Sequence, residues 1–271
     1  MSKYRFLPKP IRLRILSSLR PVSIVITCRN YGRYLQEAFI SSLNQTRKPK
    51  EIIIVDDAST DSTPEVATGL LEKYGNSRGV KTQYIRNTIK LGVAEARNRG
   101  IRLATSEYVM VLDADDQLHP LYIERVANLL DENVEVAIAY SSYREFGERN
   151  RAVKLPPFDP IVLLTDCIIM GCAMLRRSVW QMVGEYDPNQ IFEDWELWIR
   201  IVSQGWKALG CQEHLYLYRV HEDSKDAEAN RMRLEGERRI YEKHIDFYMA
   251  AGVTRLETGE WKNARRLPSY R

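Results

Sequence analysis

The chain has 271 residues, of which 44% are hydrophobic and 28% charged, and its formal net charge is +4. This length is enough for one large domain or two small ones, and the composition is ordinary for a globular protein, which confines any disorder to the chain ends. No window approaches the roughly 18 apolar residues that a membrane-spanning helix needs. We therefore expect a soluble or peripheral protein, with no nucleic acid among its partners.

The first 20 residues form a basic arm without any acidic residue. We expect either a solvated leader with a short helix over Ile11–Leu19, or an amphipathic contact with an anionic membrane surface. A signal peptide is not expected, because no uninterrupted apolar stretch follows the basic residues. The arm leaves open a peripheral position at the inner face of the membrane. Its basic residues are Lys3, Arg5, Lys9, Arg12, Arg14 and Arg20.

The four cysteines do not indicate a metal site. None of them forms a CxxC pair, and their neighbours are largely apolar. Buried, reduced thiols are the expected state, which favours a cytoplasmic location. They are Cys28, Cys167, Cys172 and Cys211.

From Pro21 onward, strand-like and helix-like segments alternate. Near-continuous apolar strands need cover on both faces, so this order predicts an α/β fold, a mostly parallel sheet with helices on each side. The second helix is expected to begin with Thr63 as its cap and Pro64 as its first helical residue. The strands are expected at Val22–Thr27, Glu51–Asp57, Lys81–Arg86 and Glu107–Asp113, and the helices over Tyr34–Gln45, from Thr63 to about Tyr74, and after Gly92.

The regular alternation fades after Tyr140. A proline-rich loop near Pro156 is followed by weaker signals of secondary structure. A charged helical stretch is expected from Asp223 to about Ala250. The last twenty residues look loosely ordered. The weaker signals are a strand at Cys172–Arg177, a short helix at Ser178–Gly184 and two short strands at Trp206–Gly210 and His214–His221, whereas Asp194–Gly205 is a clear helix.

We expect one compact domain with appendages. Its boundaries are a basic arm at 1–20, a main domain at 21–224 and a C-terminal helix and tail at 225–271. The main domain divides into two halves, 21–120 and 121–224.

Polar residues follow three of the four predicted strands. In a doubly wound sheet, ligands gather at the carboxyl ends of the strands, so these residues should share one rim. They are Thr27, Arg29 and Asn30 after the first strand, Asp56 and Asp57 after the second, and Asp113, Asp115 and Asp116 after the fourth.

The acids after the fourth strand predict a divalent cation. Asp113 and Asp115 are two residues apart, so their side chains can point the same way and would repel each other without a cation between them. Mg²⁺ and Mn²⁺ prefer oxygen ligands and often bind carboxylates together with substrate phosphates. The alternative is that these are turn residues, with Asp116 capping a helix that begins at Pro120.

Five blocks of the sequence, spanning roughly Pro21 to Ser224, are VSIVITCRNYGRYLQEAFISSLNQT, EIIIVDDASTDST, KLGVAEARNRGI, FEDWELWIRI and YRVHEDS. Together they resemble the family-2 glycosyltransferases, whose fold is the Rossmann-like, nucleotide-sugar-binding GT-A type. The resemblance implies inverting transfer from a nucleotide-diphosphate sugar, with UDP as the expected nucleotide, to a hydroxyl of a glycan or lipid-linked acceptor in polysaccharide or glycoconjugate assembly. It also implies that residues 21–120 are the nucleotide-binding half and residues 121–224 the acceptor half.

The resemblance also assigns roles at the nucleotide end. Asp57 would accept a hydrogen bond from the base, with Asp56 supporting the loop, whereas the plain alternative is an Asx-turn. Thr27, Arg29 and Asn30 would frame the same nucleotide, unless Arg29 forms a surface ion pair.

A cation and a metal site are expected next to the diphosphate. Arg97, near the start of a helix, would add a cation there, unless it pairs with an acid on the helix surface. Asp113 and Asp115 would carry the metal and ribose contacts, with Asp115 as the direct ligand of Mn²⁺ or Mg²⁺. Asp116 is a candidate to share that role. His221 is a third candidate ligand, against the alternative of a structural histidine.

The acids in FEDWELWIRI stand at the start of a predicted helix. By resemblance, Asp194 is the catalytic base that deprotonates the acceptor hydroxyl, and Glu193 is placed among the nucleotide-sugar-binding residues. The alternative is that both acids only cap the helix.

Two other functions stay open from sequence, a nucleotidyltransferase and an inert nucleotide- or glycan-binding module. A nucleotidyltransferase normally has a glycine-rich loop after the first strand, which TCRNYGRYL is not.

Overall fold

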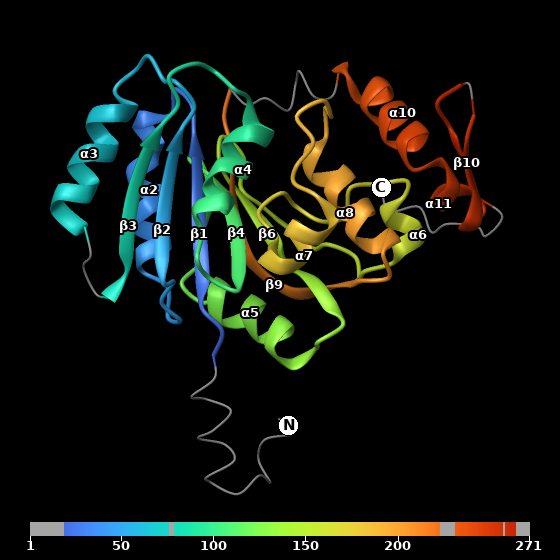
Figure 1. The fold of residues 1–271 in the computed structure, drawn as a ribbon, viewed down its shortest axis with the longest axis horizontal. Coiled ribbons are helices and arrows are strands. Elements are labelled where there is room, and N and C mark those ends of the chain that lie inside the picture. The colour runs from blue at the N-terminus through green and yellow to red at the C-terminus, as the bar shows by residue number, and fades with distance from the viewer. Residues whose placement is uncertain (1–18, 76–78, 223–230, 257, 264–271) are drawn as a thin grey trace, which may run out of the picture.

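A computed structural model describes residues 19–75, 79–222, 231–256 and 258–263. Most of the basic arm, with its predicted helix, and the end of the C-terminal tail lie outside these residues. The described chain forms a central sheet covered by helices on both faces, with the C-terminal helices at one end (Figure 1). The predicted α/β fold is confirmed. None of the described helices is long and apolar enough to cross a membrane.

The first half of the chain follows the predicted alternation. Three details differ from the prediction. Ser62 precedes the second helix, whose first residue is Thr63, a short extra strand forms at Gln117–Leu118, and the next helix begins at Tyr122 rather than at Pro120. The strands are β1 (Val22–Cys28), β2 (Glu51–Asp56), β3 (Lys81–Arg86), β4 (Tyr108–Asp113) and β5 (Gln117–Leu118), and the helices are α2 (Gly32–Leu43), α3 (Thr63–Tyr74), α4 (Val93–Leu103) and α5 (Tyr122–Glu132).

Alternate residues of β1 face two separate cores. Ile24 and Ile26 pack with α2 and α5, whereas Val25 packs with α4 and the helices of the second half. Helix α4 lies very close to the sheet, because a Cβ on Gly100 would overlap the side chain of Val25. This close approach carries the first turns of α4 to the carboxyl ends of β1 and β4.

Among the described residues, nine strands form one mixed sheet in the order β3-β2-β1-β4-β8-β6-β9-β5, with β7 paired to β6. Strands β3, β2, β1 and β4 are parallel, as are β6 and β9, whereas β8, β5 and β7 pair antiparallel. The remaining elements of this half are β6 (Val136–Gly147), β7 (Arg151–Val153), α6 (Pro160–Leu163), β8 (Met174–Arg176), α7 (Arg177–Val183), α8 (Glu193–Ser203) and β9 (Lys207–Val220).

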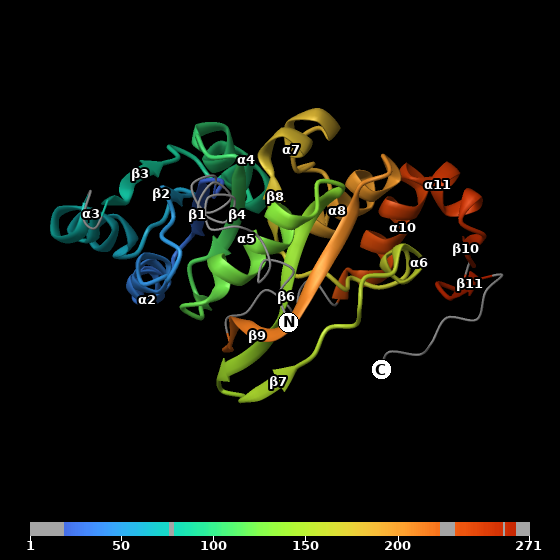
Figure 2. The same ribbon diagram turned by 90° about the horizontal axis from the view of Figure 1, so that it is seen from below.

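The structure is more regular after Tyr140 than the sequence predicted. Strand β6 continues to Gly147, and the two short strands expected after Trp206 are a single strand, β9. The register between β6 and β9 shifts near Ser142, where irregular pairing accommodates the polar stretch that interrupts the apolar pattern of β9. Figure 2 shows β6 and β9 side by side, and the end of β9 that precedes His221 pairs with β5, the strand after β4.

The C-terminal region is also more ordered than expected. The predicted single helix is broken at His244 into α10 (Arg233–Lys243) and α11 (Ile245–Ala250). Part of the tail expected to be loose forms a hairpin of β10 (Val253–Arg255) and β11 (Trp261–Asn263).

A buried carboxylate attaches α10 to α8. Glu196 is fully buried, and its oxygens lie 2.7 Å from Arg200 Nη2, 3.0 Å from Lys243 Nζ and 2.8 Å from His244 Nε2. Burial alone would raise the pKa of Glu196, but the hydrogen bond from His244 and the charge of Arg200 lower it to about 2. The ionised carboxylate therefore stabilises the packing of the C-terminal helix.

We expect Glu196→Gln to lower the free energy of unfolding at pH 7 by about 2 kcal/mol, because it leaves partly buried cations unpaired. The folded pKa lies below the unfolded value of about 4.3, so this stabilisation is present above the unfolded pKa and is lost as pH falls toward the folded pKa. Urea denaturation at pH 7 and at pH 3.5 should show a smaller difference from wild type at the lower pH. Glu235→Gln, on the outer face of α10, is the control. Equal losses of unfolding free energy in Glu196→Gln and Glu235→Gln would contradict the role of Glu196 in attaching α10 to α8.

Candidate active site

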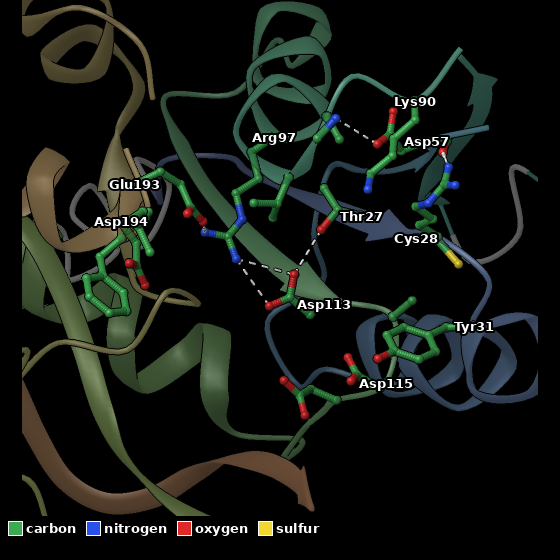
Figure 3. A pocket seen from close by; sticks show the side chains of 18 of the residues that line it. Thr27, Cys28, Tyr31, Asp57, Lys90, Arg97, Asp113, Asp115, Glu193 and Asp194 are labelled. Atoms are coloured by element: carbon green, nitrogen blue, oxygen red, sulfur yellow. Dashed lines mark hydrogen bonds and ion pairs between the residues drawn. The ribbon is translucent and has the colours of Figure 1, made fainter. Parts of the chain in front are cut away.

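A cavity of about 560 Å³ opens at the carboxyl ends of β1, β2 and β4 and extends to the start of α8 (Figure 3). It brings together most of the residues that the sequence singled out, and it excludes Asn30, Asp56 and His221 from its lining. The predicted residues that line it are Thr27, Arg29, Asp57, Arg97, Asp113, Asp115, Asp116, Glu193 and Asp194.

Asp57 holds the loop that leads into α4. Its carboxylate accepts hydrogen bonds from Asn87 Nδ2 at 2.7 Å, from the backbone N–H of Leu91 at 2.8 Å and from that of Gly92 at 2.9 Å. Arg29 donates to the carbonyl oxygen of Asp57 at 2.5 Å. The carboxylate is therefore fixed at the cavity wall by donors from a neighbouring loop.

Asp56 and Asn30 lie behind this wall. Asp56 is fully buried and accepts from the backbone N–H of Ser59 at 2.8 Å and from Tyr84 Oη at 2.9 Å. Asn30 accepts from the backbone N–H of Thr60 at 2.8 Å and has a φ of 56°, a left-handed conformation that asparagine tolerates. Both side chains shape the loop after β2, which is the supporting role expected for Asp56.

Arg97 connects the two halves of the cavity. Its guanidinium is 5% exposed and donates to Glu193 Oε1 at 2.6 Å and to Asp113 Oδ2 at 3.2 Å, while Thr27 donates to Asp113 from the other side at 3.0 Å. Burial opposes its charge, but Asp113 and Glu193 raise the pKa of Arg97 well above its usual value. Arg97 is thus an internal cation rather than a residue of the helix surface (Figure 3).

Asn98, the next residue of α4, fixes the segment before α8. Its side chain donates to the carbonyl oxygen of Tyr186 at 2.8 Å and accepts from the N–H of the same residue at 2.9 Å. Asn98 is 1% exposed. The sequence indicated this residue only through its place in KLGVAEARNRGI, because its partner is 88 positions away.

Asp194 lies in the first turn of α8. Its Oδ1 accepts a hydrogen bond from the backbone N–H of Trp195 at 2.7 Å, so the capping alternative holds in part for Asp194, although Phe192, the residue before the helix, makes no side-chain cap. Burial raises the pKa of Asp194, and Arg97 opposes that effect. Burial likewise raises the pKa of Glu193 to about 7 against the effect of Arg97. The carboxylate of Asp194 therefore binds a proton more tightly than an ordinary aspartate does.

Gly171 closes the space beside Asp194. A Cβ at this position would lie 2.9 Å from Asp194 Oδ2 and 3.4 Å from Arg97 Nη2. Any side chain here would push against the carboxylate or the guanidinium. No motif in the sequence identified this glycine as a site residue, because the contact is made by a loop that precedes β8.

Asp115 pairs with His221, which lies behind the cavity wall. The distance from His221 Nε2 to Asp115 Oδ2 is 3.0 Å, and the imidazole also packs edge-on against the ring of Tyr31. Burial and the nearby charge of Asp113 raise the pKa of Asp115. A carboxylate and an imidazole thus meet at the rim.

Asp116 points away from this pair. It is 2% exposed and accepts hydrogen bonds from Tyr216 Oη and from the backbone N–H of Arg219 at 2.7 Å. It does not cap α5, which Leu121 precedes without a side-chain cap. Its carboxylate is therefore engaged with β9.

A metal ion at the rim would find few protein ligands. Within the described ranges, no group of three His, Cys, Asp or Glu side chains is arranged to hold a metal ion. The Asp115–His221 pair offers an oxygen and a nitrogen, which suit Mn²⁺, and further ligands would have to come from a bound diphosphate.

The model of the family described as glycosyl transferase family 2 matches residues 23–184. A curated relative from Escherichia coli, the UDP-Glc:alpha-D-GlcNAc-diphosphoundecaprenol beta-1,3-glucosyltransferase WfaP, is 31% identical over 211 residues, which cover 76% of this chain and 80% of that protein. The uncharacterized glycosyltransferase YibD of Escherichia coli K12 is 27% identical over 85% of this chain and 69% of its own length.

Two solved structures share the fold. The mannosyltransferase PcManGT from Pyrobaculum calidifontis, in complex with GDP-Man and Mn²⁺, superposes with a TM-score of 0.66 at 21% identity, over 84% of this chain and 65% of that one. TarS 1–349 of S. aureus in complex with UDP-GlcNAc gives a TM-score of 0.62 at 16% identity, over 85% and 73%. The expected fold and family are confirmed: the chain belongs to glycosyl transferase family 2 and is a nucleotide-sugar-dependent glycosyltransferase.

Proposed function

We propose that this enzyme transfers a sugar, with inversion at the anomeric carbon, from a UDP-sugar to a hydroxyl group of a glycan or lipid-linked saccharide. The observation that carries the proposal is that Asp194 shares one cavity with Asp57, Asp113 and Asp115, and that Arg97 lies between them. The names of WfaP and of the TarS complex support a UDP-sugar, and the PcManGT complex makes GDP-mannose the alternative donor.

The donor would lie along the strand ends. Asp57 is already oriented by three donors and keeps acceptor capacity for an N–H of the base, since a carboxylate offers about four lone-pair sites. Thr27 and Arg29 lie beside it, at the end of β1. The nucleotide would then run from Asp57 toward Asp113, with its diphosphate near Asp115.

Asp194 would act as the base. It faces the cavity from the side opposite Asp57, which leaves the sugar between a leaving diphosphate and an incoming hydroxyl (Figure 3). Its raised pKa strengthens it as a proton acceptor toward an alcohol. Attack from this side would displace the diphosphate in line through an oxocarbenium-like transition state and invert the anomeric centre.

Arg97 would hold Asp113 and Glu193 in place and stabilise the leaving diphosphate. It neutralises Asp113 and Glu193 by direct contact and adds positive charge close to the leaving group.

The residues at the rim fit a divalent cation. Asp115 and His221 would hold it, and their carboxylate and imidazole atoms are an acceptable pair for Mn²⁺. When bound, the ion supplies positive charge that stabilises the departing diphosphate. Mg²⁺ is the alternative ion. The named Mn²⁺ complex of PcManGT supports Mn²⁺.

Location and the basic arm remain predictions. A peripheral position at the cytoplasmic face of the membrane would bring residues 1–20 to anionic lipid and the cavity to a lipid-linked acceptor.

Asp194→Asn should abolish catalysis and leave donor binding intact, because the amide keeps the shape of the side chain but cannot take a proton. Release of UDP from UDP-glucose or UDP-GlcNAc should fall about 10³-fold, within the range for loss of a general base. The affinity for UDP with Mn²⁺, measured by calorimetry, should stay within about twofold. Asp115→Ala should weaken both activity and binding. Turnover of the Asn variant at the parent rate would exclude Asp194 as the base.

Gly171→Ala should slow turnover about tenfold, since the methyl group would displace Asp194 or Arg97 by a few tenths of an ångström, and small misplacements of reacting groups are costly. UDP affinity should not change, because the donor end lies elsewhere. Gly69→Ala on α3, where a Cβ meets nothing within 4 Å, is the matched control. If both variants turn over like wild type, Gly171 does not position the base.

Removal of divalent ions with EDTA should stop UDP release, and added Mn²⁺ should restore it. His221→Ala should raise the Mn²⁺ concentration needed for half-maximal activity about tenfold or more, as for the loss of a metal ligand or its support. Full activity in EDTA would contradict the metal site.

A further inference from the structure

The two ends of the cavity differ in chemistry. The end at β1 and β2 is lined by charged groups that include Arg29, Asp57 and Lys90. The end beside Asp194 is lined by Ile191, Phe192 and Met232, which offer no charge and no side-chain hydrogen-bonding group. If Asp194 is the base, as proposed above, the acceptor must occupy this apolar end.

Helix α10 builds and fixes this apolar wall. Met232 directly precedes α10, lines the cavity and is 41% exposed. Gly236 in the same helix lies directly against Phe192, because a Cβ on it would be 2.5 Å from the Phe192 ring and 3.4 Å from Ile191 Cβ. Only a glycine lets the helix approach this closely. The ring of Phe192 is thus held between α10 and Trp195, whose ring centroid is 6.1 Å away.

Several contacts make this wall rigid. The ionised Glu196 joins α8 to the end of α10, and Lys243 of α10 lies 2.6 Å from Asp187 in the segment before α8. Figure 1 shows α10 beside α8, the helix whose first turn contains Asp194. The wall is therefore part of the folded framework and exists before any substrate binds.

We propose that Phe192 and Met232 form the acceptor subsite, that α10 is its specificity-determining element, and that its ligand is a pyranose ring that lays its C–H face on Phe192. An aromatic ring beside aliphatic side chains stabilises an apolar face, and hydroxyl groups at the ring edge are free to reach Asp194. An anionic polyol phosphate would lose hydration against Ile191, Phe192 and Met232 without gaining a charged partner from them.

The test is saturation-transfer NMR with the wild-type protein in UDP and Mg²⁺, a diamagnetic ion, which together fill the donor end. Methyl β-D-glucopyranoside is the ring probe and glycerol 3-phosphate the anionic probe. We expect transfer to the ring C–H protons of the glucoside and at least twofold less transfer to glycerol 3-phosphate. Equal transfer to the two probes, or none to the glucoside, would overturn the proposal.

Variants locate the subsite. Phe192→Leu, Met232→Ser and Gly236→Ala should each reduce the glucoside signal at least twofold, the last because the new methyl group pushes Phe192 into the cavity. Met182→Ser, 61% exposed on α7, and Gly69→Ala should leave it unchanged. Unchanged signals in Phe192→Leu and Met232→Ser would also overturn the subsite.

Two readouts separate this proposal from the function it rests on. UDP affinity and melting temperature, measured on the same samples, report folding and the donor end. Wild-type protein that fails to bind UDP or to release it from UDP-sugars would contradict the proposed function, whereas loss of the glucoside signal with UDP binding intact concerns the acceptor wall alone.

Discussion

The site depends on the ion pairs that the buried guanidinium of Arg97 makes with Asp113 and Glu193. The guanidinium contacts an acid from the end of β4 and an acid from the start of α8, two segments that are 80 residues apart in the chain. A buried charge is costly unless its partners are close and well oriented, so Arg97 favours only those arrangements in which Asp113 and Glu193 face it together. Because Asp194 follows Glu193 directly, the same contact sets the position of the expected base.

The neighbouring contacts add to this constraint. Asn98 holds the backbone at Tyr186, and the contact of α4 with the sheet at Gly100 fixes the helix that carries both residues. Gly171 limits the space beside Asp194 from the opposite side. The carboxylate is thereby confined among groups from α4, α8 and one loop, in surroundings that raise its pKa. Rigidity and proton affinity both depend on burial here, although the charge of Arg97 opposes the rise in the pKa of Asp194.

The parts of the fold that could be predicted are those with a local cause. β-Branched runs such as Ile52–Val55 and the helical spacing in α2 and α8 identify strands and helices within a few residues. Polar groups at strand ends meet at one rim because parallel strands share a direction, which is why the cavity gathers Thr27, Asp57 and Asp113. Strand β9 was predicted as two short strands, because its polar middle breaks the apolar pattern. That middle is held in the sheet by pairing with β6.

Individual side chains at the site were harder to predict, because their surroundings come from distant segments. Asp115 and Asp116 are neighbours in one motif, yet one meets His221 and the other is engaged by Tyr216 and Arg219 of β9. Successive residues point in different directions, so adjacency in sequence does not give a shared ligand. Gly171 and Gly236 are important because other groups pack closely against them, Asp194 against the first and Phe192 against the second. No local sequence pattern identifies such glycines.

The origin of the two cavity ends bears on how the enzyme selects its substrates. The donor end is made by residues 27–116, within the segment that the family model matches, whereas Phe192, Asp194 and Met232 follow that segment. A wall contributed by α10 can change in shape without moving β1, β2 or β4, because α10 contacts Phe192 and α8 and pairs with none of these strands. Donor recognition would then be a property of the shared sheet, and acceptor recognition a property of the C-terminal helix. Through the close contact between Gly236 and Phe192, such a change in α10 would alter the surface that the acceptor meets.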